Sequence, residues 1–169
     1  MLIGCVEKEA VNNIGSIDTL INFFPEYPFT WEYEGSGSYY HIMSIDKINV
    51  YQDGINYLIS GEVISEKNPS NFDDYLLSIR YILTDKGIRQ EKQEKKMIDS
   101  KYNSLYILKF PIEKGNSWTE KVIDDSGSSK TLECSIVDIQ FQDGKKIIKI
   151  RYNEKYSDYY EIREIMEKK

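Results

Sequence analysis

The feature that most constrains this chain is a repeated pattern of short alternating apolar runs separated by turn signals, from Phe29 onward. Alternation with a period of two places every second side chain on one face, as in a half-buried β-strand. Asp53-Gly54 and Asp143-Gly144 are the strongest hairpin signals, because a type I′ turn needs positive φ at both central residues and Asp-Gly accepts this readily. Asp85-Lys86-Gly87 and Ser126-Gly127 predict two further hairpins. The chain is therefore predicted to form successive antiparallel strands.

The same alternation predicts where the core lies. Apolar side chains that share a strand face are expected to pack together: Ile55, Tyr57, Ile59 and Val63; Tyr75, Leu77, Ile79, Tyr81 and Leu83; and Ile148, Ile150 and Tyr152. We expect a mainly β fold of about ten strands in an antiparallel, strongly curved sheet, half-barrel or barrel, with a two-sheet β-sandwich as the alternative. Little helix is expected, apart from one or two turns that Ser16 caps and that end before Pro25.

Two stretches depart from regular alternation. After Ser128 the apolar positions are first Leu132, Cys134 and Ile136, and then Val137, Ile139 and Phe141. This odd step predicts a β-bulge or a strand that bends between layers. The run IRQEKQEKK, residues 88–96, is almost wholly charged. It predicts a solvent-facing edge strand that lysines protect against pairing with another chain.

Length and charge limit the organisation and the partners of the chain. A chain of 169 residues is long enough for one substantial core, so we expect residues 17–169 to form a single domain. The formal net charge of -6 has the wrong sign for holding phosphates, so nucleic acid is not expected as a partner. No apolar run approaches the roughly 20 residues that a membrane-spanning helix needs.

The N-terminal residues Leu2-Ile3-Gly4-Cys5 resemble the lipobox of bacterial lipoproteins, in which a small residue precedes the cysteine that becomes lipidated. A complete export signal also needs a basic segment and an apolar segment of about 7–15 residues before the cysteine. A trimmed signal, a late start codon and a chance match all stay open. We expect residues 1–16 to be a lipobox-like stub and tether, with lipid attachment at Cys5. The domain would then lie on the outer face of the cytoplasmic membrane, and a cytoplasmic location is the alternative.

The second cysteine, Cys134, occupies a predicted core position. It is expected to be a small buried hydrophobe instead of a reactive thiol. A disulfide between Cys5 and Cys134 is conceivable only if Cys5 carries no lipid and the compartment is oxidising.

Two segments carry a resemblance to a known group of proteins: FPEYPFTWEYEGSGSYYH at 24–41 and LKFPIEKGNSW at 108–118. They are similar to the W-x-Y-x-G and P-[LI]-x-x-G-x-x-W segments of uncharacterised lipoprotein-like β domains of Gram-positive bacteria. The resemblance implies export and a β fold, and it implies no reaction. It also implies a glycine-rich closing strand after Tyr159-Tyr160-Glu161, whereas this chain continues to Lys169 without glycine, so the final strand is expected to be short or missing. From the residues, the second segment is predicted to be a turn that Trp118 anchors.

Neither catalytic nor metal-binding patterns emerge from the sequence. His41 is the only histidine, and no serine or cysteine lies in a recognisable nucleophile motif. One histidine and two distant cysteines do not complete a usual zinc site, and Asp73-Asp74 and Asp124-Asp125 lack the spacing of an EF-hand loop. We therefore predict no enzyme activity, no metal and no cofactor.

A ligand site is predicted where aromatic residues cluster on two neighbouring strands. Trp31 and Tyr33 share a face of one strand, and Tyr39 and His41 return on the next. With Glu32 or Glu34 they are predicted to line one mouth of the sheet and to stack on a flat or glycan-like ligand. Cross-strand aromatic packing is the alternative explanation.

These features together predict a non-catalytic, lipid-anchored extracytoplasmic domain that binds a ligand or a protein partner at the cell envelope. A structural or assembly role in the envelope is the alternative, followed by a small extracytoplasmic hydrolase.

Overall fold

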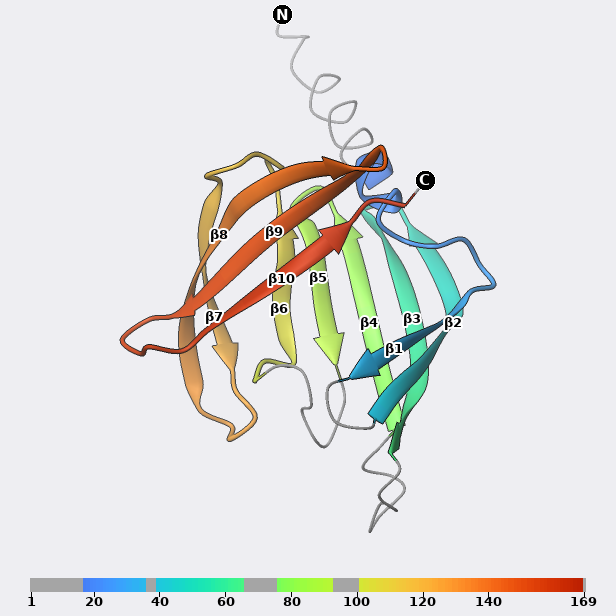
Figure 1. Cartoon of the computed structure of the whole chain (residues 1–169), viewed down its shortest axis with the longest axis horizontal. Helices are drawn as coiled ribbons and strands as arrows, with labels where there is room; N and C mark the ends of the chain where they lie inside the picture. Colours follow the sequence, from blue (N-terminus) through green and yellow to red (C-terminus); the bar gives the residue numbers. More distant parts are fainter. Residues whose placement is uncertain (1–16, 36–38, 66–75, 93–100, 169) are drawn as a thin grey trace, which may run out of the picture.

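The computed structural model describes residues 17–35, 39–65, 76–92 and 101–168 (Figure 1). These residues form a short helix at 17–21 and ten β-strands. The strands are β1 (Thr30–Gly35), β2 (Tyr39–Tyr51), β3 (Gly54–Ser65), β4 (Leu76–Thr84), β5 (Gly87–Lys92), β6 (Ser104–Lys109), β7 (Ser117–Ile123), β8 (Ser129–Gln142), β9 (Lys145–Glu154) and β10 (Tyr160–Met166).

The strands form two antiparallel sheets, in the orders β1-β2-β3-β4-β5-β6 and β10-β9-β8-β7. In Figure 1, β8, β9 and β10 cross in front of the larger sheet. The prediction of a mainly β, antiparallel fold with little helix is confirmed. The preferred form of one curved sheet, half-barrel or barrel is not found, and the two separate sheets agree with the alternative in this respect.

The sheets separate between β6 and β7, where a side chain replaces strand pairing. The Glu120 carboxylate on β7 accepts hydrogen bonds from the backbone N–H of Tyr106 on β6 at 3.0 and 3.2 Å. Arg89 on β5 approaches the same carboxylate at 3.3 Å. A backbone donor of β6 is thus satisfied without a neighbouring strand.

The predicted hairpins form, although not all with the expected turn residues. Asp143 and Gly144 have φ angles of 51° and 72° between the paired residues Gln142 and Lys145, as a type I′ turn requires. Gly54, by contrast, already pairs with Tyr51, so its hairpin turns at 52–53. A Cβ atom on Gly54 would lie 2.4 Å from the Leu83 carbonyl oxygen, so close strand packing is the reason for glycine there.

The predicted core rows lie in the interior, except for Tyr75, which is outside the described residues. The fully or nearly fully buried members of these rows are Tyr57, Ile59, Val63, Leu77, Ile79, Leu83, Ile148, Ile150 and Tyr152. Two hydrogen bonds also join the sheets across the interior. The Tyr152 hydroxyl donates to the Ile107 carbonyl oxygen at 2.6 Å, and Arg163 Nη1 donates to Gln90 Oε1 at 3.2 Å.

The bulge predicted in the strand after Ser128 is confirmed. The register between β8 and β9 shifts between Ile136 and Asp138. Ile136 is buried before the shift, and Ile139 packs against the core after it. The last apolar residue of the strand, Phe141, is exposed.

The edge-strand prediction for residues 88–96 is wrong for the part that the structure describes. Strand β5 pairs with both β4 and β6, so it lies inside the larger sheet. Its Ile88 and Gln90 side chains are buried, whereas Arg89 and Glu91 form ion pairs on the other face. Residues 93–96 lie outside the described part of the chain.

Both ends of the described chain meet at one end of the sheets. The helix at 17–21 agrees with the predicted one or two turns, while its predicted cap Ser16 is outside the described residues. Leu20 is fully buried and the Phe24 ring stacks on Tyr57 at 4.6 Å. The Lys168 N–H donates to the Asn22 carbonyl oxygen at 2.6 Å. The closing strand that was expected to be short or missing is present as β10, with seven residues paired to β9.

Among the described residues, no helix has the length and apolar character needed to cross a membrane.

Candidate functional site

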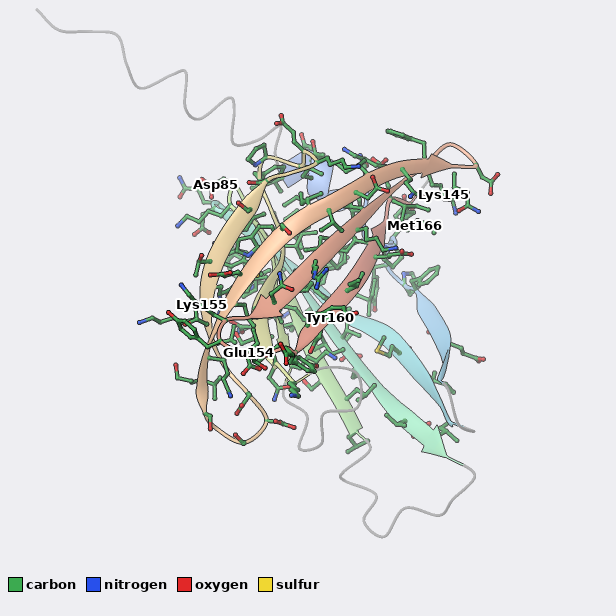
Figure 2. The ribbon with its side chains drawn as sticks, turned by 60° about the vertical axis from the view of Figure 1, so that its left-hand side comes forward. Asp85, Lys145, Glu154, Lys155, Tyr160 and Met166 are labelled. Carbon is green, nitrogen blue, oxygen red and sulfur yellow. The ribbon has the colours of Figure 1, made fainter. Side chains whose placement is uncertain are left out.

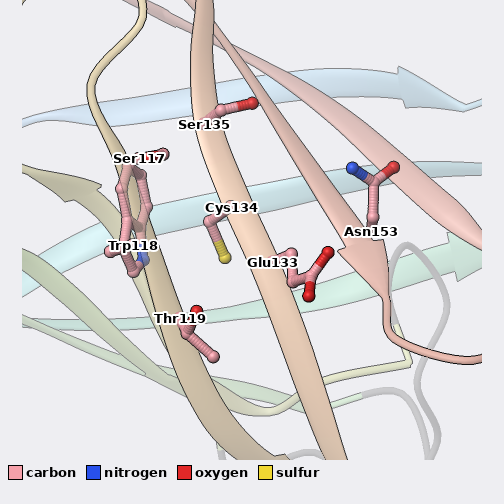
Figure 3. A pocket seen from close by; sticks show the side chains of 7 residues that line it. All are labelled: Ser117, Trp118, Thr119, Glu133, Cys134, Ser135 and Asn153. Atoms are coloured by element: carbon pink, nitrogen blue, oxygen red, sulfur yellow. The ribbon is translucent and has the colours of Figure 1, made fainter.

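A hollow of about 530 Å³ lies on the smaller sheet (Figure 3). Seven residues of β7, β8 and β9 line it: Ser117, Trp118, Thr119, Glu133, Cys134, Ser135 and Asn153. This volume is within the range of about 300–1,000 Å³ that is typical of small-molecule sites.

Strand register explains why these side chains gather on the outer face. Thr119 lies opposite Glu133, which lies opposite Asn153, so these residues form one row across three strands. A second row joins Ser117 to Ser135 and then to Arg151 on β9. The positions between the two rows belong to Trp118, Cys134 and Tyr152, of which the latter two are buried in the core. Short serine and threonine side chains leave the space above the strands open.

Two exposed tyrosines lie beside the hollow. Tyr160 on β10 pairs with Asn153, and 51% of its surface is exposed while the Arg151 guanidinium lies 4.3 Å from its ring centroid. Tyr156, in the loop between β9 and β10, is 94% exposed and has a φ of 66°. A bulky residue with positive φ is uncommon and costs about 1–3 kcal/mol. Figure 2 labels Tyr160, together with Glu154 and Lys155 at the end of β9.

Charges at the hollow are paired with one another. Lys155 Nζ lies 3.4 Å from Glu133 Oε1, and this hydrogen-bonded carboxylate raises the pKa of the lysine. Arg151 Nε donates to Asn153 Oδ1 at 2.8 Å. The hollow therefore offers hydroxyl, amide and carboxylate groups without a large excess of either charge.

Cys134, which lines the hollow, has an unreactive thiol. Burial raises the pKa of the Cys134 thiol to about 12, so the reactive thiolate is almost absent at neutral pH. The prediction that Cys134 is a buried core residue is confirmed. Cys5 lies outside the described residues, so its lipidation and its pairing with Cys134 stay predictions.

Trp118 links the hollow to the predicted turn at 108–118. Gly115 has a φ of 92°, and the Asn116 side-chain amide donates to the carbonyl oxygens of Lys109 and Pro111 at 3.0 and 2.7 Å. The Trp118 ring then packs edge-on against Tyr152, with centroids 6.5 Å apart. The predicted turn is confirmed, although Gly115 is the one residue of Lys114-Gly115-Asn116 with positive φ. The Trp118 ring packs on Tyr152 of β9, and its packing over the turn stays a prediction.

The predicted aromatic site lies on the other sheet. The register places Tyr33 opposite His41 and Trp31 opposite Met43, so β1 and β2 pair as the sequence predicts. Tyr39 lies opposite Gly35, and Glu32 is exposed. The side chains of residues 31, 33–35 and 39–41 lie outside the described part, and their role in ligand binding stays a prediction.

Sequence reasoning missed the hollow because it followed the apolar face of each strand. The alternate positions of the same strands, Ser117 and Thr119, Glu133 and Ser135, and Arg151 and Asn153, carry the signal. The sequence does not show which polar rows become neighbours, because that depends on strand order and register.

A second polar cluster lies between β8, β9 and the segment before β6. The Tyr102 hydroxyl donates to Glu154 Oε2 at 2.8 Å, and Lys130 Nζ lies 3.0 Å from Glu154 Oε1. Lys130, and secondly Tyr102, hold the pKa of Glu154 below its usual range. Tyr102 is fully buried, and burial raises its own pKa. The cluster joins the smaller sheet to the chain that enters the larger one, which indicates a structural role.

We expect Glu154→Gln to lower the free energy of unfolding at pH 7 by about 1 kcal/mol, because the charge-assisted hydrogen bonds weaken. The folded-state pKa of Glu154 is depressed, so its contribution is present above the unfolded pKa of about 4.3 and is lost as the pH falls through the folded pKa. Urea unfolding between pH 7 and pH 2.5 should show the two proteins converging at the acidic end. The control is Glu164→Gln, which alters the exposed pair with Lys149. An equal loss in the control, or a difference that grows with acid, would contradict the expectation.

Within the described ranges, no group of three or more His, Cys, Asp and Glu residues is arranged to hold a metal ion. Asp124 instead caps its own turn, with Oδ1 accepting from the N–H groups of Ser126 and Ser128 at 3.0 and 2.8 Å. Asp73-Asp74 lie outside the described residues.

Comparison of the chain with protein-family models, with curated proteins and with solved structures finds no match. The resemblance to lipoprotein-like domains therefore stays an expectation.

Proposed function

We propose that this chain is a non-catalytic binding domain of the bacterial cell envelope, and that the hollow on β7, β8 and β9 holds its ligand. The observation that carries the proposal is the composition of the hollow, where hydroxyl, amide and carboxylate side chains converge beside two exposed tyrosines. Convergent polar groups orient the ligand in small-molecule sites, and this hollow has more of them than the mainly apolar lining of most such sites. Cys134 is buried in the core and burial raises the pKa of its thiol, so this residue offers no thiolate nucleophile to the hollow.

Location at the envelope is part of this proposal and is supported by the lipobox-like residues Leu2-Ile3-Gly4-Cys5. A lipid on Cys5 would tether the domain to the outer face of the cytoplasmic membrane, within reach of cell-wall polymers. The ligand would then be a component of the envelope.

Ser135→Trp tests the proposal by filling the hollow. We expect the unmodified protein to pellet with detergent-washed, protein-free cell walls of a Gram-positive bacterium, and the variant to pellet at least about tenfold less, a loss of about 1.4 kcal/mol in binding. The matched control is Gln140→Trp, which adds the same ring to an exposed position of the same strand beyond the bulge. Thermal unfolding should show that both variants remain folded. Equal pelleting of all the proteins, or pelleting of none, would contradict the proposal.

A further inference from the structure

We infer that the ligand of this hollow is a neutral oligosaccharide, an inference that rests on the proposed function and specifies its ligand. A sugar ring presents hydroxyl groups around its edge and C–H groups on its faces. A matching protein surface needs polar side chains that both donate and accept hydrogen bonds, next to exposed aromatic rings. The outer face of the smaller sheet has both features.

The polar part of this match is the row Thr119, Glu133 and Asn153, which crosses three adjacent strands. The Glu133 carboxylate accepts from Lys155 at Oε1, and its remaining lone pairs can accept from the hydroxyl groups of a sugar. The Asn153 amide and the Thr119 hydroxyl add both donors and acceptors. Ser117 and Ser135, in the next row, leave the space that a ring requires.

The aromatic part is Tyr160, which continues the row on β10 beyond Asn153. The Arg151 guanidinium lies 4.3 Å from its ring centroid, and about half of its surface remains exposed. Tyrosine offers a large contact area with a polar tip, so it suits a ligand with mixed polarity. Tyr156 is the second exposed ring. It lies in the loop after β9, next to Lys155, which forms an ion pair with Glu133 on β8.

Charge distinguishes this ligand class from the acidic polymers of an envelope. Glu133 is paired with Lys155, and Arg151 is engaged with both Asn153 and the Tyr160 ring. No surplus of positive charge is therefore available in the lining to hold a polyanion. An apolar ligand is disfavoured too, because the outward-facing lining residues Ser117, Thr119, Glu133, Ser135 and Asn153 are all polar.

Amide NMR titration of the full chain tests the inference with cellotetraose, maltotetraose and tetra-N-acetylchitotetraose as probes. We expect at least one of them to shift the amide signals of Thr119, Glu133 and Asn153. Separate Glu133→Gln and Tyr160→Ala variants should each raise the dissociation constant of that probe about tenfold or more, as expected for the loss of a charged hydrogen bond or of a stacking ring. The control Phe141→Ala removes an exposed ring from the far end of β8 and should leave the dissociation constant unchanged.

The outcomes separate this inference from the proposed function. If none of the probes shifts these signals while wall binding remains sensitive to Ser135→Trp, the ligand is not a neutral oligosaccharide and the binding function stands. If a probe binds but neither Glu133→Gln nor Tyr160→Ala weakens it, the assigned site is wrong. If Ser135→Trp leaves binding to cell walls unchanged, the proposed function itself is wrong, regardless of whether a probe binds.

Discussion

Tyr152→Ala is expected to lower the free energy of unfolding by about 3–5 kcal/mol, the range for deleting a large buried aromatic side chain. Tyr152 is fully buried on β9, and its ring packs edge-on against Trp118. The Arg163 guanidinium lies 5.3 Å from the ring centroid. The Tyr152 hydroxyl donates to the Ile107 carbonyl oxygen across the interior, so this one side chain contacts both sheets. Urea denaturation monitored by circular dichroism measures the loss.

Tyr152→Phe separates the two contributions of this residue. The ring and its packing remain, whereas the Ile107 carbonyl oxygen loses its buried donor, which costs about 1–3 kcal/mol. We therefore expect the phenylalanine variant to lie between the unmodified protein and the alanine variant. A phenylalanine variant as unstable as the alanine variant would show that the hydrogen bond dominates. An alanine variant that loses under about 1 kcal/mol would contradict the view that this ring is central to the core.

Gly87→Ala is expected to destabilise the protein by at least about 3 kcal/mol, because two penalties act together. Gly87 has a φ of 138°, a backbone angle that residues with a Cβ atom rarely adopt. The added Cβ would also lie 2.1 Å from the Leu108 carbonyl oxygen, in the ladder between β5 and β6. The backbone of an interior strand would have to move. Thermal and urea unfolding measure the effect.

Gly127→Ala is the matched control for Gly87→Ala. Gly127 also has positive φ, at 82°, but a Cβ atom there would meet no described atom within 4 Å. Only the conformational penalty applies, and we expect a loss of about 1 kcal/mol. An equal decrease in the free energy of unfolding for both variants would mean that the crowding between β5 and β6 does not contribute to the destabilisation.

Local signals predicted most of the strands and hairpins of this fold. The Asp143-Gly144 turn follows from the backbone preference of two residues, and the bulge in β8 follows from a change of parity in one apolar pattern. Division into two sheets was harder to predict, because β6 and β7 follow one another in the chain without pairing, and the Glu120 carboxylate instead accepts the Tyr106 N–H. A side chain that takes the place of a backbone hydrogen-bond partner does not change the apolar periodicity of either strand.

The error at β5 has a physical reason. A run of charges indicates exposure, and Arg89 and Glu91 do lie on the outer face. The position of a strand within its sheet, however, depends on its backbone hydrogen bonds, to which side-chain charge is only an indirect guide. Gln90 lies on the buried face of the strand, where Arg163 of the opposite sheet donates a hydrogen bond to its side-chain oxygen. That partner is 73 residues away in the sequence.

The candidate site was less predictable than the fold. The aromatic residues of β1 and β2 stand out in the sequence because they are concentrated in one short segment. The hollow consists instead of common polar residues that are separated along the chain and meet only through the register of β7, β8 and β9.

The order of the strands also has a consequence for how the chain folds. Within each sheet, every strand pairs with its neighbour in the sequence. Contacts between residues close in sequence require little loop-closure entropy, and topologies rich in such contacts fold faster than Greek-key β proteins of similar size. Each strand ladder of this protein therefore joins strands that follow one another in the chain, whereas contact between the two sheets needs residues far apart in the sequence, such as Ile107 and Tyr152.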